Sequence, residues 1–176
     1  MIIRRPYWQN LIEEAWKERT LVWLMGIRRV GKTSLCKSLP NITYFDCELP
    51  RTRQLMADPE EFLASQMGKR IVLDEIHRLE NPSELLKIAA DHYPEVHIIA
   101  TGSSTLGASA HFKDTLTGRK RQVWLTPLLL EEMPLFGSED IRHRFLFGGL
   151  PFFFEQTHIP EEDFKEWLIA YWAKDI

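Results

Sequence analysis

Cysteine is scarce in this chain of 176 residues, which contains only Cys36 and Cys47. Two cysteines are too few for a disulfide scaffold and lack zinc-site spacing, a usage typical of proteins in a reducing cytosol. Long apolar runs are also absent, and Met1 is followed by IIRR rather than by the apolar segment of a signal peptide. These absences predict a soluble cytoplasmic protein that makes no membrane contact.

Patterns of dedicated metal ligands are missing as well. The six histidines show neither an HExxH pattern nor clustered ligand spacing, so we expect no metal site built from histidine. His77 follows Glu75 by two residues, and it either tunes that carboxylate or is an ordinary loop histidine. Repeats and low-complexity tracts are absent too, and the composition, with 44% hydrophobic and 27% charged residues, is typical of one globular domain.

The chain has no excess of positive charge, because its formal net charge is −3. Such a balance is not that of a general nucleic-acid binder. Residues 1–40 nevertheless hold eight basic and three acidic residues, whereas residues 126–176 hold four basic and ten acidic ones. A basic face near the N-terminus suits the phosphates of a nucleotide or of a nucleic acid, and charge alone does not separate the two.

What the sequence does contain is an alternation of short apolar runs and amphipathic segments. Because strands that alternate with helices need crossover connections, we predict an α/β fold of three layers, α/β/α, with a mostly parallel five-stranded sheet. The expected strands are Thr20–Met25, Ile42–Asp46, Arg70–Asp74, Val96–Thr101 and Gln122–Leu125, and the expected helices run from about 7 to 18, 32 to 39, 59 to 67, 82 to 91, 110 to 117, 139 to 147 and 160 to 176.

Residues 26–33, GIRRVGKT, match the pattern GxxxxGK[ST] in full and lie between a predicted strand and a predicted helix. That context identifies a P-loop, in which glycines let backbone amides face phosphate oxygens and the following helix adds its N-terminal dipole. We expect Lys32 to neutralise the terminal phosphates and the Thr33 hydroxyl to ligate Mg²⁺. The two loop arginines either steer the nucleotide or clamp a carboxylate. The predicted nucleotide-binding residues are Gly26, Arg28, Arg29, Val30, Gly31, Lys32, Thr33 and Ser34.

Two adjacent acids follow the apolar run at 71–73. We expect Asp74 to bind magnesium, directly or indirectly, and Glu75 to be the general base that polarises an attacking water. The next strand ends in Thr101, followed by GSS at 102–104, at the carboxyl edge where open α/β sheets bind ligands. Ser103 or Thr101 is a candidate sensor of the γ-phosphate or of the water, and a helix N-cap is the other explanation for the serines.

Further basic and aromatic residues are candidates for contacts with the nucleotide. Within the RKR segment at 119–121, Arg119 is either an arginine finger that reaches a neighbouring subunit's γ-phosphate or part of a solvated basic cluster. Arg4, Arg5 and Tyr7 precede the first strand and are candidate contacts of the base.

Four segments taken together, GIRRVGKTS at 26–34, IVLDEIHRL at 71–79, ATGSS at 100–104 and TGRKRQVWLTPL at 117–128, resemble one family. It is the family of prokaryotic AAA-type ATPases whose P-loop domain is followed by a C-terminal domain of unknown function. FGGLP at 147–151 and YWAKDI at 171–176 are similar to that family's passage into its next domain. The resemblance covers nearly the whole chain.

The resemblance implies an additional-strand P-loop fold with the strand order 5-1-4-3-2, ATP with Mg²⁺, and ATP hydrolysis. It also implies roles in phosphate and magnesium binding for Lys32 and Thr33 and the Walker B duties for Asp74 and Glu75. A sensor role for Ser103 and an arginine finger at Arg119 are implied as well. Such proteins usually continue well past the length of this chain.

The sequence pattern changes at Thr126. We therefore predict a P-loop ATPase core at 1–125 and a helical extension at 126–176, which begins a further region. The last predicted helix has no stop signal, and we expect its aromatic face to contact a downstream region, a partner protein or a second copy of the chain. That face consists of Phe164, Trp167, Leu168, Tyr171 and Trp172.

These observations predict an Mg²⁺-dependent ATPase domain whose hydrolysis cycle drives a change in a downstream module or partner. A small-molecule kinase is an alternative, since small metabolite kinases also carry a P-loop near the start of a chain of this size. The paired acids Asp74 and Glu75 favour activation of water over an acceptor pocket. The third alternative is a nucleotide-gated binding module associated with nucleic acid.

Overall fold

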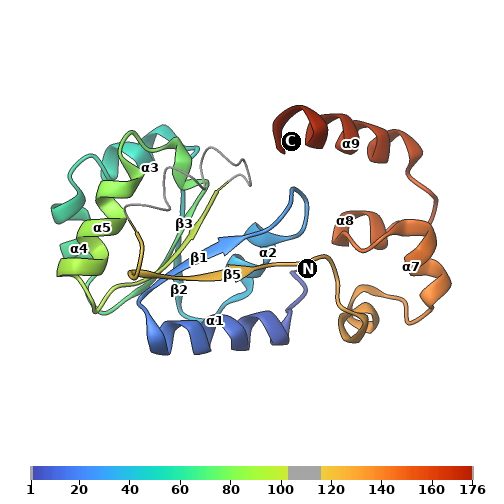
Figure 1. Ribbon diagram of the computed structural model, residues 1–176, viewed down its shortest axis with the longest axis horizontal. Coiled ribbons are helices and arrows are strands. Elements are labelled where there is room, and N and C mark those ends of the chain that lie inside the picture. The colour runs from blue at the N-terminus through green and yellow to red at the C-terminus, as the bar shows by residue number, and fades with distance from the viewer. Residues whose placement is uncertain (1, 103–115, 176) are drawn as a thin grey trace.

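Five parallel strands form one sheet in the computed structural model, which describes residues 2–102 and 116–175 (Figure 1). The sheet has the order β2-β3-β4-β1-β5, and each neighbouring pair is parallel. Counted from its other edge, this is the predicted order 5-1-4-3-2, so the predicted fold class and topology are confirmed. The strands are β1 (Leu21–Met25), β2 (Ile42–Asp46), β3 (Arg70–Asp74), β4 (His97–Thr101) and β5 (Lys120–Trp124).

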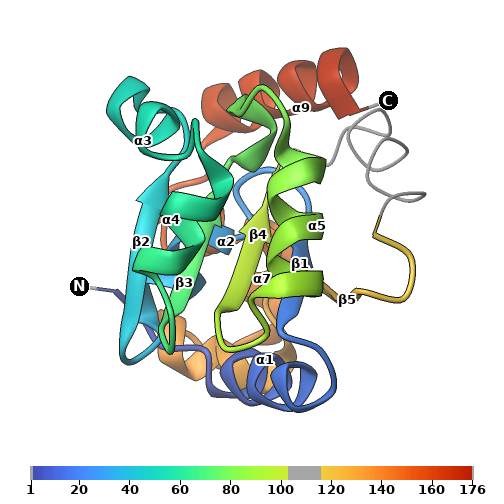
Figure 2. The same cartoon turned by 90° about the vertical axis from the view of Figure 1, so that its left-hand side faces the viewer.

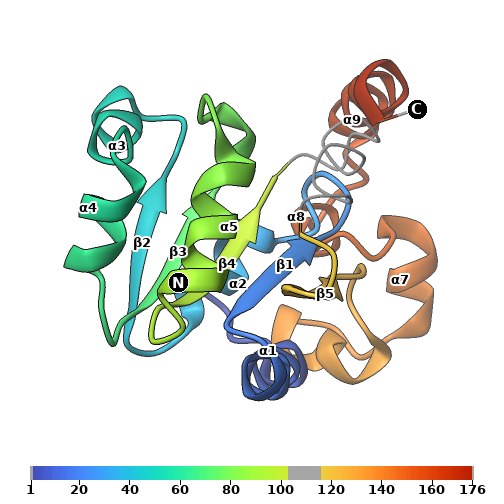
Figure 3. The same cartoon turned by 60° about the vertical axis from the view of Figure 1, so that its left-hand side comes forward.

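Helices cover both faces of this sheet, as Figure 3 shows. Side chains of β1 alternate between the faces, because successive residues of a strand point in opposite directions. Val22 and Leu24 pack in one cluster with α1 (Pro6–Glu18) and α2 (Lys32–Ser38). Leu21 and Trp23 pack in the opposite cluster with α4 (Pro59–Ser65) and α5 (Pro82–His92). The three predicted layers follow from this alternation.

Proline and a capping carboxylate set the start of α4. Asp58 accepts hydrogen bonds from the amides of Glu60 and Glu61, both at 3.0 Å, and Pro59 occupies the first turn. A carboxylate at this position satisfies amides that have no partner within the helix. The start predicted for this helix is therefore confirmed, although its end lies at Ser65 rather than near Met67.

The C-terminal part of the chain holds three helices, α7 (Ile141–Phe147), α8 (Pro151–Phe154) and α9 (Glu161–Asp175). The helix predicted at 139–147 begins at Ile141, because Asp140 is its N-cap and accepts from the first-turn amide of Arg142. The Ser138 hydroxyl accepts from the amide of Asp140. No helix in the described part of the chain combines the length and apolarity that crossing a bilayer requires.

Several short elements were not predicted from the sequence. They are α3 (Pro50–Leu55), the 3₁₀ helices η1 (Ile76–Arg78) and η2 (Leu130–Phe136), and α8. Each spans seven residues or fewer, so hydrophobic periodicity is a weak signal for it. Helix α4 is no longer than η2, but Asp58 and Pro59 mark its start. The helix predicted at 110–117 falls mostly on residues 110–115, which lie outside the described ranges.

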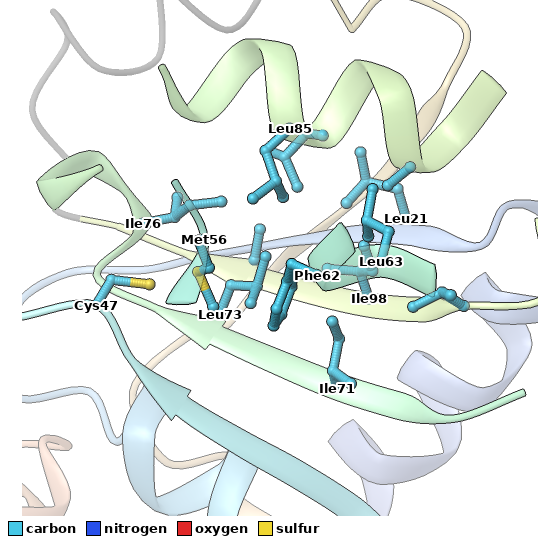
Figure 4. Packing of buried hydrophobic residues seen from close by; sticks show 14 of the residues in the cluster. Leu21, Cys47, Met56, Phe62, Leu63, Ile71, Leu73, Ile76, Leu85 and Ile98 are labelled. Carbon is cyan, nitrogen blue, oxygen red and sulfur yellow. The ribbon is translucent and has the colours of Figure 1, made fainter. Parts of the chain in front are cut away.

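Phe62 provides a test of the packing between the sheet and α4 (Figure 4). Its ring is 2% exposed and meets Phe45 edge to face at 5.2 Å between centroids. We expect Phe62→Ala to lower the free energy of unfolding by about 3–5 kcal/mol, because it removes a buried ring and leaves a cavity. Phe145, 82% exposed on α7, is the matched control, and its replacement by alanine changes stability by less than about 0.5 kcal/mol. Equal losses in urea unfolding of the two variants contradict this account of the core.

Candidate functional site

The chemistry-bearing residues gather at the carboxyl edge of the sheet. Because all strands run in one direction, the loop after β1, the acids after β3 and the end of β4 meet at this edge. Helix α9 crosses the same edge (Figure 2). The predicted P-loop and the predicted acids are thus brought together by the parallel topology.

Two glycines shape the loop that joins β1 to α2. Gly26 has φ of +151°, and a Cβ placed on it would lie 2.6 Å from the carbonyl oxygen of Leu125. Gly31 has φ of +97°, a left-handed conformation that other residues rarely adopt. Arg29 also has a positive φ of 64°. Left-handed residues in such a loop allow backbone amides to face an anion, as they do in anion-binding nests.

Lys32 lies half-buried at the first position of α2 and folds back over the loop. Its ammonium group donates to the carbonyl oxygens of Gly26 at 2.7 Å and Ile27 at 3.3 Å. Both acceptors belong to the loop itself. The positive charge therefore lies against the P-loop, next to the backbone of Gly26 and Ile27.

Asp74 is the acceptor on which three hydroxyl groups converge. It is 4% exposed, and its carboxylate accepts from the Thr33 hydroxyl at 2.8 Å and from the hydroxyls of Thr101 and Tyr44. Tyr44 was not predicted as a site residue, although its place in β2, next to β3, was a usable signal. Burial, together with the bond to Asp74, raises the pKa of Tyr44 above its ordinary value, so this phenol remains a donor.

Glu75 follows Asp74 at the same edge of the sheet, and its backbone is in the left-handed region. Its φ is +54°, and its amide donates to the Thr101 hydroxyl at 3.1 Å. Burial raises the pKa of Glu75, and the opposing attraction of His77 is smaller. Nδ1 of His77 lies 3.2 Å from Oε2 of Glu75 without the angles of a hydrogen bond. His77 is therefore a neighbour of the predicted base.

The two arginines of the P-loop face the C-terminal helices. The Arg29 guanidinium lies over the rings of Phe152 at 4.7 Å and Phe153 at 5.8 Å, an arrangement that gives cation–π attraction. The carbonyl of Arg28 accepts from the indole Nε1 of Trp167 in α9 at 3.2 Å. The predicted aromatic face of α9 thus contacts the loop of the same chain.

The structure does not bring Arg119 to this site. Arg119 precedes β5 and pairs with Asp91 near the end of α5, with Nε 2.7 Å from the carboxylate, at the opposite edge of the sheet. Ser103 lies outside the described residues. Tyr7 is 56% exposed and meets Trp8 edge to face.

Arg5, a candidate base contact, is buried beside the P-loop. It lines a hollow of about 130 Å³ next to Gly31, and its guanidinium pairs with Glu132. The N-terminal segment, the P-loop with the start of α2, η2 and α8 form the walls of this hollow. The residues concerned are Ile2, Ile3, Arg5, Gly31, Ser34, Leu35, Phe136, Pro151 and Glu155.

A larger hollow, of about 920 Å³, lies between α7 and α9. Its lining is apolar except for Glu161 and Lys165, and it contains none of the hydroxyls and acids described above. Neither thiol belongs to a reactive site, since Cys36 and Cys47 are free and buried. Burial raises the pKa of Cys47 to about 12.

Comparisons with known proteins point to one family. A family model described as an AAA domain matches residues 18–134, a range that includes the loop and both acids. No curated protein matches the sequence.

Two solved structures have a similar fold. One is a Walker-type ATPase of Pyrococcus abyssi, with a TM-score of 0.59, 19% identity, and coverage of 85% of this chain and 65% of that chain. The other is a signal transduction ATPase with numerous domains and a tetratricopeptide repeat sensor, from Pyrococcus horikoshii, with a TM-score of 0.58, 16% identity, and coverage of 94% and 32%. This chain therefore spans less than two thirds of the length of either protein.

The raised pKa of Glu75 leads to a prediction about stability. A carboxyl group whose pKa is raised by folding destabilises the native state as the pH rises above its unfolded value. We expect Glu75→Gln to be more stable than the wild-type chain at pH 7, with a difference that narrows as the pH falls toward 4.5, the ordinary value for glutamate. Urea unfolding between pH 4.5 and pH 7.5 measures this difference. Exposed Glu139 is the control, and a Glu139→Gln variant with the same pH-dependent gain would contradict the assignment.

Proposed function

This chain belongs to an AAA domain family of P-loop ATPases, and from that premise we propose that it binds ATP with Mg²⁺ and hydrolyses it. The observation that carries the proposal is the 2.8 Å bond from the Thr33 hydroxyl to Asp74. This bond joins the end of the P-loop motif to the acid at the end of β3. A hydroxyl and a carboxylate are oxygen ligands of the kind that Mg²⁺ prefers, so the residues fit the ion.

Each group of the site has a part in the proposed reaction. The loop amides and Lys32 bind the phosphates, and the ammonium exchanges its bonds to loop carbonyls for bonds to phosphate oxygens. Thr33 and Asp74 hold Mg²⁺, which neutralises charge on the phosphate oxygens when bound. Glu75 accepts the proton of the attacking water. Its burial raises the pKa toward neutrality, which improves a general base.

We propose that the base of the nucleotide lies in the hollow beside Gly31. This hollow adjoins the loop that would hold the phosphates, and Ile2, Ile3 and Leu35 give it apolar walls. Ser34 of the predicted nucleotide-binding set also lines it. With a volume of about 130 Å³, this hollow is smaller than a typical site for a whole ligand, so it would enclose only the ring of the base.

Two further roles at the site, a sensor at Ser103 and an arginine finger at Arg119, remain proposals. A sensor role for Ser103 is a prediction from the sequence, and the Thr101 hydroxyl already lies between Asp74 and the amide of Glu75. Arg119 is remote from the site of its own chain, so an arginine finger at this position would have to serve the nucleotide of a second copy.

We further propose that hydrolysis is coupled to a downstream module or a partner protein through α9. One side of this helix contacts the P-loop through Trp167. Ile169 and Trp172, on another side, are 61% and 62% exposed and line the apolar hollow against α7. Because α9 makes both contacts, a nucleotide bound to the P-loop would affect the binding of a partner in the apolar hollow.

The coupling proposal predicts that MgATP protects α9. A bound nucleotide restrains the P-loop, and the bond between the Arg28 carbonyl and Trp167 then persists longer. We expect slower amide hydrogen exchange over 161–175, and no change over α3 at 50–55, which serves as the internal control. Protection of the P-loop without any protection of α9 would remove the helix from the coupling route.

The ATPase proposal predicts separable effects of two substitutions. Lys32→Ala weakens MgATP binding at least about a hundredfold, because it removes charged hydrogen bonds to phosphate. Glu75→Gln retains MgATP but lowers kcat about 10² to 10⁴-fold, because the base is lost. Isothermal titration and phosphate release measure the two effects. Lys17→Ala, on the exposed side of α1, is the control and keeps both values.

The same assay distinguishes the alternatives. Transfer of the γ-phosphate to a small metabolite would identify a kinase instead of an ATPase. Binding of ATP without turnover, together with DNA affinity that falls steeply with added salt, would identify a nucleotide-gated binding module. Normal turnover in Glu75→Gln would exclude this residue as the base.

A further inference from the structure

The arginine next to the P-loop is fixed in place by a buried ion pair. Arg5 and Glu132 are 2% and 3% exposed, and they are separated by 127 positions in the sequence. Nε and Nη2 of Arg5 donate to the two carboxylate oxygens of Glu132 at 2.8 and 2.7 Å. A bidentate pair of this kind fixes the plane of the guanidinium as well as its position.

Glu132 is itself fixed by bonds from two other groups. Its Oε2 accepts from the amide of Leu129 at 2.9 Å and from the indole of Trp8 at 3.4 Å. Burial opposes the charge of this carboxylate, but the bonds from Arg5 and Leu129 outweigh it and lower its pKa. Glu132 is thus ionised at neutral pH, and the pair keeps both charges.

The remaining donors of Arg5 reach the backbone on either side of the site. Nη1 donates to the carbonyl oxygen of Val30, in the P-loop, at 3.2 Å. Nη2 also donates to the carbonyl oxygen of Thr126, just after β5, at 3.3 Å. One side chain therefore joins the N-terminal segment, the P-loop and the segment that leads to η2.

The bond to Val30 has a direct consequence for the nest. The peptide bond between Val30 and Gly31 is planar and trans, so its carbonyl and its amide N–H point in opposite directions. When Arg5 holds the carbonyl from behind, the N–H of Gly31 is directed away from Arg5. The positive guanidinium also polarises this peptide, which makes the N–H a better donor to an anion.

We propose that Arg5, held by Glu132, is a positioning residue of the P-loop that aims the Gly31 amide at a nucleotide phosphate. This inference rests on the proposed function, because it assumes that the loop binds phosphate. Arg5 does not touch the reacting atoms in this role. It sets the affinity of the loop for MgATP rather than the rate of the chemical step.

The test compares Arg5→Lys with Glu132→Gln in the full 176-residue chain. A lysine has its three donors on a single nitrogen and cannot reproduce the planar fork that bonds both oxygens of Glu132 and the carbonyl of Val30. We therefore expect the Kd for MgATP to rise at least about tenfold, while kcat at saturating ATP changes less than about twofold. In Glu132→Gln, the amide oxygen still accepts from Arg5, so the guanidinium keeps its place and its bond to Val30. We therefore expect its melting temperature to fall as in Arg5→Lys, with a rise in Kd of less than about threefold.

A second arginine pair provides the control for stability. Arg70 binds Glu13 in the same bidentate manner, at 2.7 and 3.0 Å, but at the amino edge of the sheet. Arg70→Lys lowers the melting temperature and leaves the Kd for MgATP unchanged. If Arg5→Lys does not fold, Arg5→Gln replaces it. Its neutral amide has two donors against the five of a guanidinium and loses the ionic attraction to Glu132, so the same tenfold rise is expected.

The outcomes distinguish a failure of the positioning role of Arg5 from a failure of the proposed MgATP binding. If the Arg5 and Glu132 variants have the same drop in melting temperature and also the same rise in the Kd for MgATP, the positioning role is wrong and the pair is purely structural. An Arg5 variant that lowers kcat with an unchanged Kd overturns it too. A wild-type chain that does not bind MgATP overturns the proposed function, and this inference with it.

Discussion

The common direction of the five strands is the constraint on which the site depends. Parallel pairing makes β1, β3 and β4 end at one edge, with β4 between the other two. Thr33 and Asp74, 41 positions apart, can therefore share a hydrogen bond. If β3 ran antiparallel to the other strands, Asp74 at its end would lie at the opposite edge of the sheet, away from the P-loop.

Much of this arrangement could be predicted from the sequence, because local signals and the fold agree. β2 and β3 have the predicted bounds, since each is a short apolar run that ends at an acid. The glycines of GIRRVGKT require a special backbone, and they have it at Gly26 and Gly31. The strand order came from the family resemblance, because periodicity identifies strands without identifying their neighbours.

The contacts that were missed are those that only folding creates. From the sequence, Glu132 would be expected to be an exposed acid in the first turn of a surface helix, yet it lies buried against Arg5. No spacing rule links two residues that lie 127 positions apart in the sequence. Tyr44 is one of several apolar or aromatic residues in β2, and its hydroxyl matters because the register places it beside β3. The short helix α8 buries Phe153 and Phe154, so tertiary packing rather than propensity stabilises it.

The location of Asp74 explains why this buried charge is tolerated. Three hydroxyl donors satisfy its oxygens, and these donors come from α2, β2 and β4. Each donor can rotate about its own bond, unlike the fixed amides of the loop. The carboxylate is thus held by groups that can turn aside when a cation approaches, which a backbone cage does not allow.

The contact between Trp167 and the carbonyl of Arg28 makes the mobility of two segments interdependent. Because α9 is hydrogen-bonded to a carbonyl of the P-loop, an ordered P-loop restricts the motion of α9. If the loop binds a nucleotide and α9 binds a partner, as proposed, then ordering one segment reduces the conformational entropy that is lost in ordering the other. The two ligands would then favour each other's binding without a change of shape.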